Sequence, residues 1–308
     1  MRAVFLGSPE FAVPSLRALL EHPEIDVPLV VTQPDRPAGR GRSLTPPAVK
    51  VAATELGIPV YQPETLRPVE SAEAILEIAP DVLIVVAYGE LLRKHVLQLT
   101  PHGCLNVHPS LLPAYRGASP IPAAILNGDP TTGVSIMRLV WKLDAGPILA
   151  QQQLDVIDGD TSGTLSKRLA QLAAGMLPEV ALAWTRGEIP EREQDDNVVT
   201  HTREWTTDDA RIDWARSAVQ VARLVRASNP WPVAWTTFNN ERFRVLGATA
   251  VDAASSEDSG HVRLLAKLVM VTTGGGTLQL DTVQPAGKRA MPAIDWWRGL
   301  RLEHASFG

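Results

Sequence analysis

Apolar segments alternate with amphipathic helical patterns through the first half of the chain, and this alternation restricts the fold more than any other feature. Four runs rich in Val, Ile and Leu, at 3–6, 27–32, 82–87 and 105–108, are typical of buried strands in a parallel sheet. Apolar residues three and four positions apart predict helices between them, at 14–21, 47–56 and 69–78. The pattern predicts an α/β fold with a Rossmann-like, mostly parallel sheet.

The second half has a different organisation. A long helix is predicted at 160–186, with Thr161 or Ser162 as N-cap and Gly187 after its last turn. Residues 188–209 are charged and lack apolar periodicity, which indicates a linker. A helical pattern at 217–227 then precedes short alternating segments, which are typical of a small β-barrel. Three glycines at 274–276 predict a hairpin turn within it. We therefore expect domains at 1–189 and 209–308, joined by a linker at 190–208.

Composition narrows the class of protein. A chain of 308 residues with 45% hydrophobic content can bury full cores for two domains. Cys104 is the single cysteine, so no intrachain disulfide can form. The apolar start is interrupted at Glu10 and lacks a charged leader, which favours a strand over a signal peptide. No apolar run approaches the length needed to cross a bilayer. We expect a cytoplasmic monomer without a membrane partner.

The net charge of −5 argues against a protein that binds nucleic acid merely by being basic. The charge is uneven, however. Residues 209–308 contain 12 Lys and Arg against 9 Asp and Glu, a local balance of +3. This excess fits a surface that faces a polyanion as well as it fits chance scatter of solvated side chains. The seven histidines show no metal-ligand spacing, so no metal is expected.

The segment 106–113, NVHPSLLP, follows a predicted strand and holds the densest group of candidate functional residues. Side chains alternate along a strand, so Asn106 and His108 project from one face near the carboxyl edge of the sheet, where α/β folds place their sites. Two prolines stiffen the backbone that follows, which could hold the planar edge of a ligand. Asp144, in a turn, is a third candidate. Each of these side chains could instead only cap or satisfy local backbone.

Ordered segments along nearly the whole chain resemble the folate-dependent formyltransferases. They are 7–11 (GSPEF), 33–42 (QPDRPAGRGR), 86–89 (VAYG), 106–113 (NVHPSLLP), 116–117 (RG), 143–146 (LDAG), 229–232 (NPWP) and 284–288 (QPAGK). The resemblance implies a Rossmann-like N-terminal domain and an OB-like C-terminal barrel. The sequence departs from the commonest family pattern at Pro109, where many relatives carry glycine, and at 140–142. We expect these departures to change how the substrate fits more than they change the reaction, because neither removes a candidate catalytic residue.

The resemblance matches Asn106, His108 and Asp144 to the family's catalytic triad. It implies transfer of a formyl group from 10-formyltetrahydrofolate to the amino group of methionyl initiator tRNA. The Asn106 amide would stabilise the oxyanion, because attack on the formyl carbon places negative charge on its oxygen. His108 would move protons, since its unperturbed pKa lies near neutrality. Asp144 would favour the imidazolium and orient the ring.

Two further groups of residues follow from the resemblance. The expected folate-binding residues are Tyr88, Ser110, Leu111, Leu112 and Pro113. The expected contacts to the tRNA and its methionyl group are Phe11, Arg36, Arg40, Arg42 and Lys288. The prolines and glycines around the three arginines predict a loop, and guanidinium groups can both pair with phosphate and stack on bases. Without the resemblance, a solvated arginine-rich loop would be the simpler interpretation.

Other functions fit less well. A formyltransferase for a small amine, such as an amino-sugar nucleotide, would use the same triad, but the arginine-rich loop and the barrel favour tRNA. A dinucleotide-binding oxidoreductase would need a glycine fingerprint after the first strand, and Gly7 is followed there by Ser8, Pro9 and Glu10. A non-catalytic RNA-binding module leaves the triad unexplained. Cys104 could suggest a thioester, but a buried small hydrophobic residue is the simpler interpretation.

Overall fold

The structure, a computed structural model, describes residues 1–38, 43–251, 253, 256–302 and 304–308. The chain forms two compact units. Unit 1 contains residues 1–117, 131–155 and 166–202, and unit 2 contains residues 118–130, 156–165 and 203–308. Each unit is built around its own sheet. The long helix α6 (Ser162–Thr185) begins in the residues of unit 2 and continues in those of unit 1.

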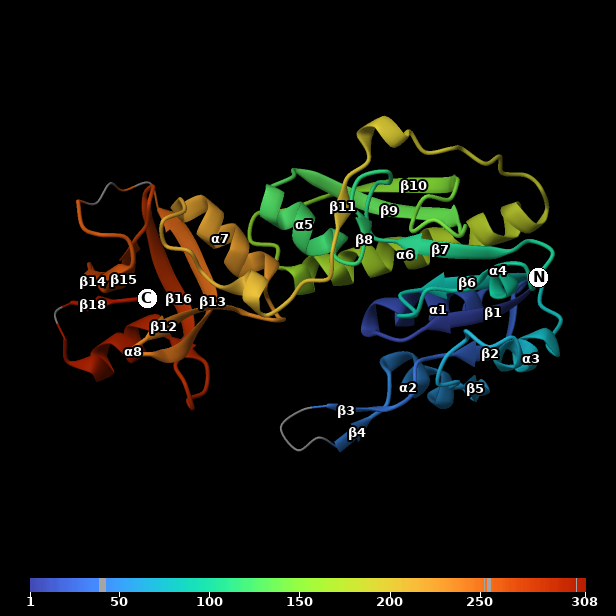
Figure 1. The fold of residues 1–308 in the computed structure, drawn as a ribbon, viewed down its shortest axis with the longest axis horizontal. Helices are drawn as coiled ribbons and strands as arrows, with labels where there is room; N and C mark the ends of the chain where they lie inside the picture. Colours follow the sequence, from blue (N-terminus) through green and yellow to red (C-terminus); the bar gives the residue numbers. More distant parts are fainter. Residues whose placement is uncertain (39–42, 252, 254–255, 303) are drawn as a thin grey trace. The chain divides into compact units, whose positions relative to one another are not determined.

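Unit 1 is built on a seven-stranded sheet with the order β10-β9-β7-β6-β1-β2-β5 (Figure 1, from top to bottom of the view). Its strands are β1 (Arg2–Gly7), β2 (Asp26–Val31), β5 (Val60–Tyr61), β6 (Val82–Val86), β7 (Cys104–His108), β9 (Thr131–Arg138) and β10 (Ile148–Asp155). The strands from β7 to β5 are parallel, whereas β9 runs antiparallel to both β7 and β10. The predicted mostly parallel sheet is therefore confirmed.

The parallel part of the sheet is covered on both faces. All five residues of β6 are buried, as expected for a central strand between two layers. Besides α6, the helical elements of unit 1 are η1 (Glu10–Ala12), α1 (Val13–Glu21), α2 (Ala48–Glu55), η2 (Glu70–Ala72), α3 (Glu73–Leu76), α4 (Lys94–Leu97) and η3 (Asp196–Val198). The single helix predicted at 69–78 is wrong: η2 and α3 replace it. Val69 and Leu76 are exposed, so too few apolar side chains reach the core to hold one continuous helix.

Two small sheets complete unit 1. The strands β3 (Arg36–Ala38) and β4 (Ser43–Thr45) pair antiparallel, and β8 (Arg116–Gly117) pairs parallel with β11 (His201–Thr202). The first ribbon corrects the expectation of a loop at Arg36, because a two-stranded ribbon tolerates proline at its edges. Arg40 and Arg42 lie outside the described residues. In the second ribbon only β11 lies in the segment predicted as a linker, and the residues of that segment up to 202 belong to unit 1.

Unit 2 contains an antiparallel sheet with the order β12-β13-β16-β15-β14-β18, in which β17 also pairs with β16. The strands are β12 (Ala234–Phe238), β13 (Glu241–Val251), β14 (His261–Leu265), β15 (Leu268–Thr272), β16 (Thr277–Gln284), β17 (Met291–Pro292) and β18 (Ala305–Ser306). The helices are α5 (Pro120–Asn127), η4 (Asp208–Ala210), α7 (Ala218–Ala227) and α8 (Ala293–Leu300). The curled antiparallel sheet agrees with the predicted small barrel, and the glycines at 274–276 connect β15 to β16 as expected.

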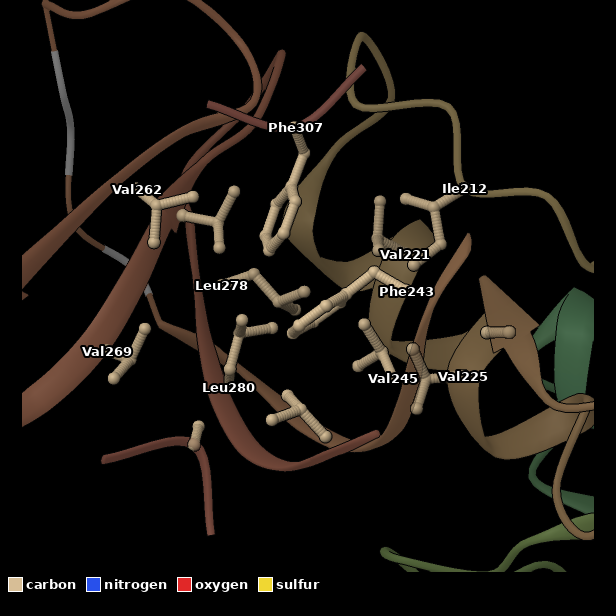
Figure 2. Close-up of a cluster of buried hydrophobic side chains, with 14 of the residues drawn as sticks. Ile212, Val221, Val225, Phe243, Val245, Val262, Val269, Leu278, Leu280 and Phe307 are labelled. Atoms are coloured by element: carbon tan, nitrogen blue, oxygen red, sulfur yellow. The ribbon is translucent and has the colours of Figure 1, made fainter. Parts of the chain in front are cut away.

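The core of unit 2 is aromatic and aliphatic (Figure 2). Phe243 and Phe307 lie with their ring centroids 5.0 Å apart, and Phe307 also stacks on Trp214 at 5.3 Å. Alternating residues of β13 and β16, among them Val245 and Leu280, point into this cluster. These contacts hold the sheet against α7 and α8. Trp231, by contrast, is 61% exposed, although its flanking prolines suggest a packed residue.

None of the helices in the described ranges has the length and apolar character that crossing a membrane would require.

Candidate active site

The strand β7 carries two of the three predicted catalytic side chains to the carboxyl edge of the unit 1 sheet. It pairs with β6 on one side and with β9 on the other, with Asn106 beside Val85 and His108 beside Ser135. Asn106 and His108 are two residues apart on one strand, so they project from the same face. The edge position arises because parallel strands end together where the chain leaves each strand for the next helix or loop.

His108 and Asp144 contact each other. Nδ1 of His108 lies 3.7 Å from Oδ2 of Asp144, and Nε2 lies 2.9 Å from the carbonyl oxygen of Tyr115. Because a carbonyl only accepts, Nε2 must donate, which leaves Nδ1 of the neutral ring unprotonated. Burial lowers the pKa of His108, although Asp144 and the Tyr115 carbonyl act in the opposite direction. The ring is therefore neutral near pH 7, and a proton that arrives at Nδ1 meets a carboxylate.

Asp144 is held in place by backbone. Its Oδ2 accepts a hydrogen bond of 2.8 Å from the amide of Gly117. Its φ of +45° is a left-handed conformation that non-glycine residues seldom adopt. The side chain is 11% exposed, so the carboxylate acts in a partly dehydrated surrounding where its charge is weakly screened. This arrangement suits a group that orients and polarises His108.

The Asn106 amide is available to a ligand. The residue is half-buried, and no hydrogen bond connects its side chain to any other residue in the described ranges. An amide on the same strand face as His108 is a neutral donor beside a proton-transfer group. The structure thus brings His108 and Asp144 together and places Asn106 on the adjoining position of that face.

The predicted folate-binding loop is well fixed. The Ser110 hydroxyl donates to the Ala114 carbonyl at 2.6 Å, and the Leu112 amide donates to the Ser135 hydroxyl at 3.0 Å. Leu112 is 3% exposed and packs with Met137, while Leu111 and Pro113 are half-buried. The side chains of Ser110 and Leu112 are therefore used within the protein. A role of 110–113 in binding folate stays a prediction that depends on the rigidity of this loop.

Tyr88 lies at the end of β6 and is 1% exposed. Its hydroxyl is buried and has no hydrogen-bond partner in the described part of the chain, and burial raises its pKa. Tyr88 also lines a cavity of about 820 Å³, together with residues that include Ser8, Gln33, Pro47 and Val51. This cavity lies at the ends of β1, β2 and β6. Asn106, His108 and Asp144 are not among its lining residues.

The described residues among the predicted tRNA and methionyl contacts belong to both units. Phe11 is half-buried in η1, and Arg36 is exposed in β3 with its guanidinium 3.4 Å from the Gln33 side chain. Lys288 belongs to unit 2, where it is exposed after β16. Arg40 and Arg42 fall outside the described residues. The role of these residues stays a prediction.

Cys104 is buried at the start of β7, where it is 1% exposed. Its thiol contacts the Val96 carbonyl at 3.7 Å, and burial raises its pKa to about 12. It is therefore a core residue, as expected, and is unsuited to thioester chemistry. Nowhere in the described ranges do three His, Cys, Asp or Glu side chains gather as they would around a metal ion.

Two residues of the site were missed by sequence reasoning. Tyr115 contributes its carbonyl to His108, and Gly117 contributes its amide to Asp144. Both contacts are made by backbone, which leaves no side-chain signature. The pair Arg116-Gly117 resembles a family segment, but the resemblance assigns it no role.

Two family descriptions match this chain. The family described as "Formyl transferase" matches residues 1–181, and "Formyl transferase, C-terminal domain" matches residues 205–301. Together they cover most of both units.

Three relatives agree with this result, and each is named "Methionyl-tRNA formyltransferase". The protein from Chloroflexus aggregans is 46% identical over 310 residues, which is 100% of both chains. That from Roseiflexus sp. (strain RS-1) is 46% identical over 98% of this chain and 93% of its own. That from Methylococcus capsulatus is 45% identical over 96% of each.

Solved structures with low sequence identity share the fold. One is WlaRD, a sugar 3N-formyl transferase, with a TM-score of 0.66 and 15% identity over 94% of this chain and 99% of that one. Another is HypX from Aquifex aeolicus in complex with tetrahydrofolic acid, with a TM-score of 0.64 and 17% identity over 96% of this chain and 46% of that one. From its fold, its site and these full-length relatives, this chain belongs to the formyl transferase family.

Proposed function

We propose that this protein transfers the formyl group of 10-formyltetrahydrofolate to the amino group of methionyl initiator tRNA. The observation that carries the proposal is the 45–46% identity, over 96–100% of this chain, to relatives named for that substrate. The contact between His108 and Asp144 supports it, because this transfer needs a group that can accept and release a proton near neutral pH.

In the proposed reaction the amine lone pair forms a bond to the formyl carbon, and the bond from that carbon to the folate nitrogen breaks. Asn106 donates a hydrogen bond to the oxygen on which negative charge develops. His108 accepts the proton that the attacking nitrogen loses, and the same proton passes to the leaving folate nitrogen. Asp144 stabilises the imidazolium in between. No covalent link to the protein is needed.

We assign catalysis to unit 1, and we propose that unit 2 binds the tRNA together with the arginine-rich segment 36–42 of unit 1. In unit 2 the guanidinium groups of Arg211 and Arg242 lie 5.6 and 4.2 Å from the ring centroid of Trp235. Arg244 is paired with Trp235 across β12 and β13, and it projects from the same face. None of the three arginines forms a salt bridge within the described residues. Three cations without a carboxylate partner, two of them over the Trp235 ring, suit phosphate contacts, and Lys288 would add another.

A competition among amine acceptors tests the proposal. Purified protein is given 10-formyltetrahydrofolate and one of three acceptors: methionyl initiator tRNA, an amino-sugar nucleotide or glycinamide ribonucleotide. We expect kcat/KM to be highest for the tRNA. A preference for the amino-sugar nucleotide would contradict the assignment. It would favour the alternative of a formyltransferase for a small amine, the substrate class of the sugar 3N-formyl transferase that shares this fold.

The donor is tested separately. We expect turnover with 10-formyltetrahydrofolate and none with the 5-formyl isomer, because only the former presents its formyl group on the nitrogen that leaves. We further propose a monomer that acts in the cytoplasm. The single cysteine, Cys104, is buried and free, so the protein needs no oxidising compartment and does not form a disulfide-linked dimer through it. A sedimentation measurement in which the protein behaves as a dimer would contradict the monomer.

A further inference from the structure

The segment 192–202, which leads out of unit 1, is attached to the site at both ends. At its start, Arg192 and Ile148 exchange two backbone hydrogen bonds of 2.8 and 3.0 Å. At its end, the Arg116 amide donates to the Thr200 carbonyl at 2.9 Å, and β11 pairs with β8. The middle of the segment is therefore held beside the turn that contains Asp144.

Gln194 lies in this middle part and uses its whole amide. Its Nε2 donates to the carbonyl oxygens of Asp144 and Gly146, at 2.8 and 2.7 Å. Its Oε1 accepts from Nε of Arg116 at 3.0 Å. An amide with both hydrogens and its oxygen engaged has one orientation, so the side chain fixes the turn at two carbonyls.

Arg116 makes this arrangement rigid. It is 1% exposed and is the largest fully buried side chain in the described ranges. Besides Gln194, its guanidinium donates to Asp196 at 2.9 Å, and Lys142 approaches the other oxygen of that carboxylate at 3.2 Å. These cations lower the pKa of Asp196, the hydrogen bond from Lys142 having the larger effect. A buried guanidinium with fixed partners leaves Gln194 little freedom.

The opposite side of the turn is also closed. A Cβ at Gly146 would overlap the carbonyl oxygen of Arg138, so this backbone approaches the end of β9 as closely as glycine permits. The turn holding Asp144 is thus enclosed between β9 and the Gln194 amide. Its carboxylate can reach both the Gly117 amide and His108 only while the turn keeps this position.

We propose that Gln194, supported by Arg116, is a positioning residue for formyl transfer, which fixes the Asp144 turn against His108. This inference rests on the proposed function, in which Asp144 stabilises the imidazolium. It assigns a role to a residue that touches neither substrate, within a stretch that its sequence suggests is only a linker. It also means that the segment 192–202, which leads out of unit 1, helps to hold the turn that contains Asp144.

The test uses two variants and a matched control in the full-length protein. Gln194→Ala removes the whole amide. Gln194→Glu keeps the size and an oxygen for Arg116 but removes both donors and faces two carbonyls with a carboxylate. Glu193→Gln changes the exposed neighbour, whose side chain has no hydrogen bond in the described part of the chain.

We expect both Gln194 variants to lower kcat about 10- to 100-fold, because a small displacement of an orienting group costs this much. The KM values for folate and tRNA should stay within about twofold, since neither substrate is touched. Glu193→Gln should behave as the wild type. Unchanged kcat in both Gln194 variants would overturn the inference, as would a loss in Gln194→Ala with wild-type turnover in Gln194→Glu, which would mean that only packing against Arg116 matters.

A second readout does not depend on turnover. The pKa of His108, followed by NMR of its ring protons, should fall in Gln194→Ala, because Asp144 raises that pKa and moves away. An unchanged pKa of His108 would contradict the inference, even if the wild-type protein proved to formylate an amine other than methionyl tRNA. Failure of the wild type to formylate any amine would instead contradict the proposed function, so the two failures are distinguishable.

Discussion

At the scale of single residues, His108 is subject to opposing effects that suit a proton carrier. Burial favours the neutral ring, while Asp144 and the Tyr115 carbonyl favour the imidazolium. The neutral form therefore predominates at rest, and the charged form is supported when a proton arrives. The sequence predicted the side chains of this site from strand alternation and family resemblance. It could not predict the Tyr115 carbonyl or the Gly117 amide, because backbone contacts depend on how the loop folds.

The lowered pKa of His108 predicts how stability depends on pH. Above its ordinary value of 6.5, the ring is neutral in both the folded and the unfolded chain. Below 6.5 the unfolded chain binds the proton first, so stability falls as the pH drops towards the folded pKa, by at most about 1.4 kcal/mol per pH unit. Chemical denaturation between pH 7.5 and 5 should show a smaller decline in His108→Asn. Identical slopes in the two proteins would contradict the burial effect.

Asn106→Ala should lower kcat about 100-fold or more, because it removes the donor aimed at the developing oxyanion. The change should leave the unfolding temperature nearly unaltered, since no described residue hydrogen-bonds to this amide. Steady-state kinetics and thermal denaturation check both expectations. A variant with wild-type turnover would exclude Asn106 from the site.

At the scale of elements, the predicted strands β1, β2, β6 and β7 agree with the structure to within about one residue, because long apolar runs have few alternatives. The pairs β9–β10 and β8–β11 were not predicted. β10 carries half-exposed and polar residues such as Gln151 and Gln152, and β8 and β11 have two residues each, too few for a periodic signal. The β8–β11 ribbon nevertheless supports Asp144, because the Gly117 amide in β8 donates to the Asp144 carboxylate.

Gly117→Ala tests that ribbon. Gly117 has φ of +107°, and a Cβ there would overlap the carbonyl oxygen of Thr202, so the substitution must separate β8 from β11. We expect a loss of about 2 kcal/mol or more in the free energy of unfolding, together with a lower kcat. Gly187→Ala is the control, because Gly187 has φ of +72° with open space around it and should cost only about 1 kcal/mol. Equal losses in both variants would show that the contact with Thr202 is unimportant.

At the scale of the whole molecule, two units with different chemistry fit a substrate that is itself large. Unit 1 holds the carboxylate, imidazole and amide, whereas unit 2 presents unneutralised arginines around Trp235. The expected division into domains at 1–189 and 209–308, with a linker at 190–208, remains a prediction. Residues 118–130 and 156–165 belong to unit 2, although they precede the predicted linker. The sequence pattern could not reveal this, because α5 packs on α7, a helix that is distant from it in the sequence.

Arg242→Ala should weaken tRNA binding and reduce the slope of log affinity against log salt by about one, as expected when one phosphate contact is lost. Arg263→Ala is the matched control, since Glu257 already neutralises Arg263 at 2.6 Å. Filter binding at several salt concentrations measures both. Equal effects of the two variants would contradict a specific contact at Trp235.

The central claim is that one imidazole moves the proton of a formyl transfer while other residues bind the tRNA. It is tested most directly by measuring single-turnover formylation and tRNA affinity together in His108→Ala. We expect the rate to fall by about 10² to 10⁴ and the Kd for methionyl tRNA to stay close to that of the wild type. A variant that loses rate and affinity equally, or that keeps its rate, would contradict the account.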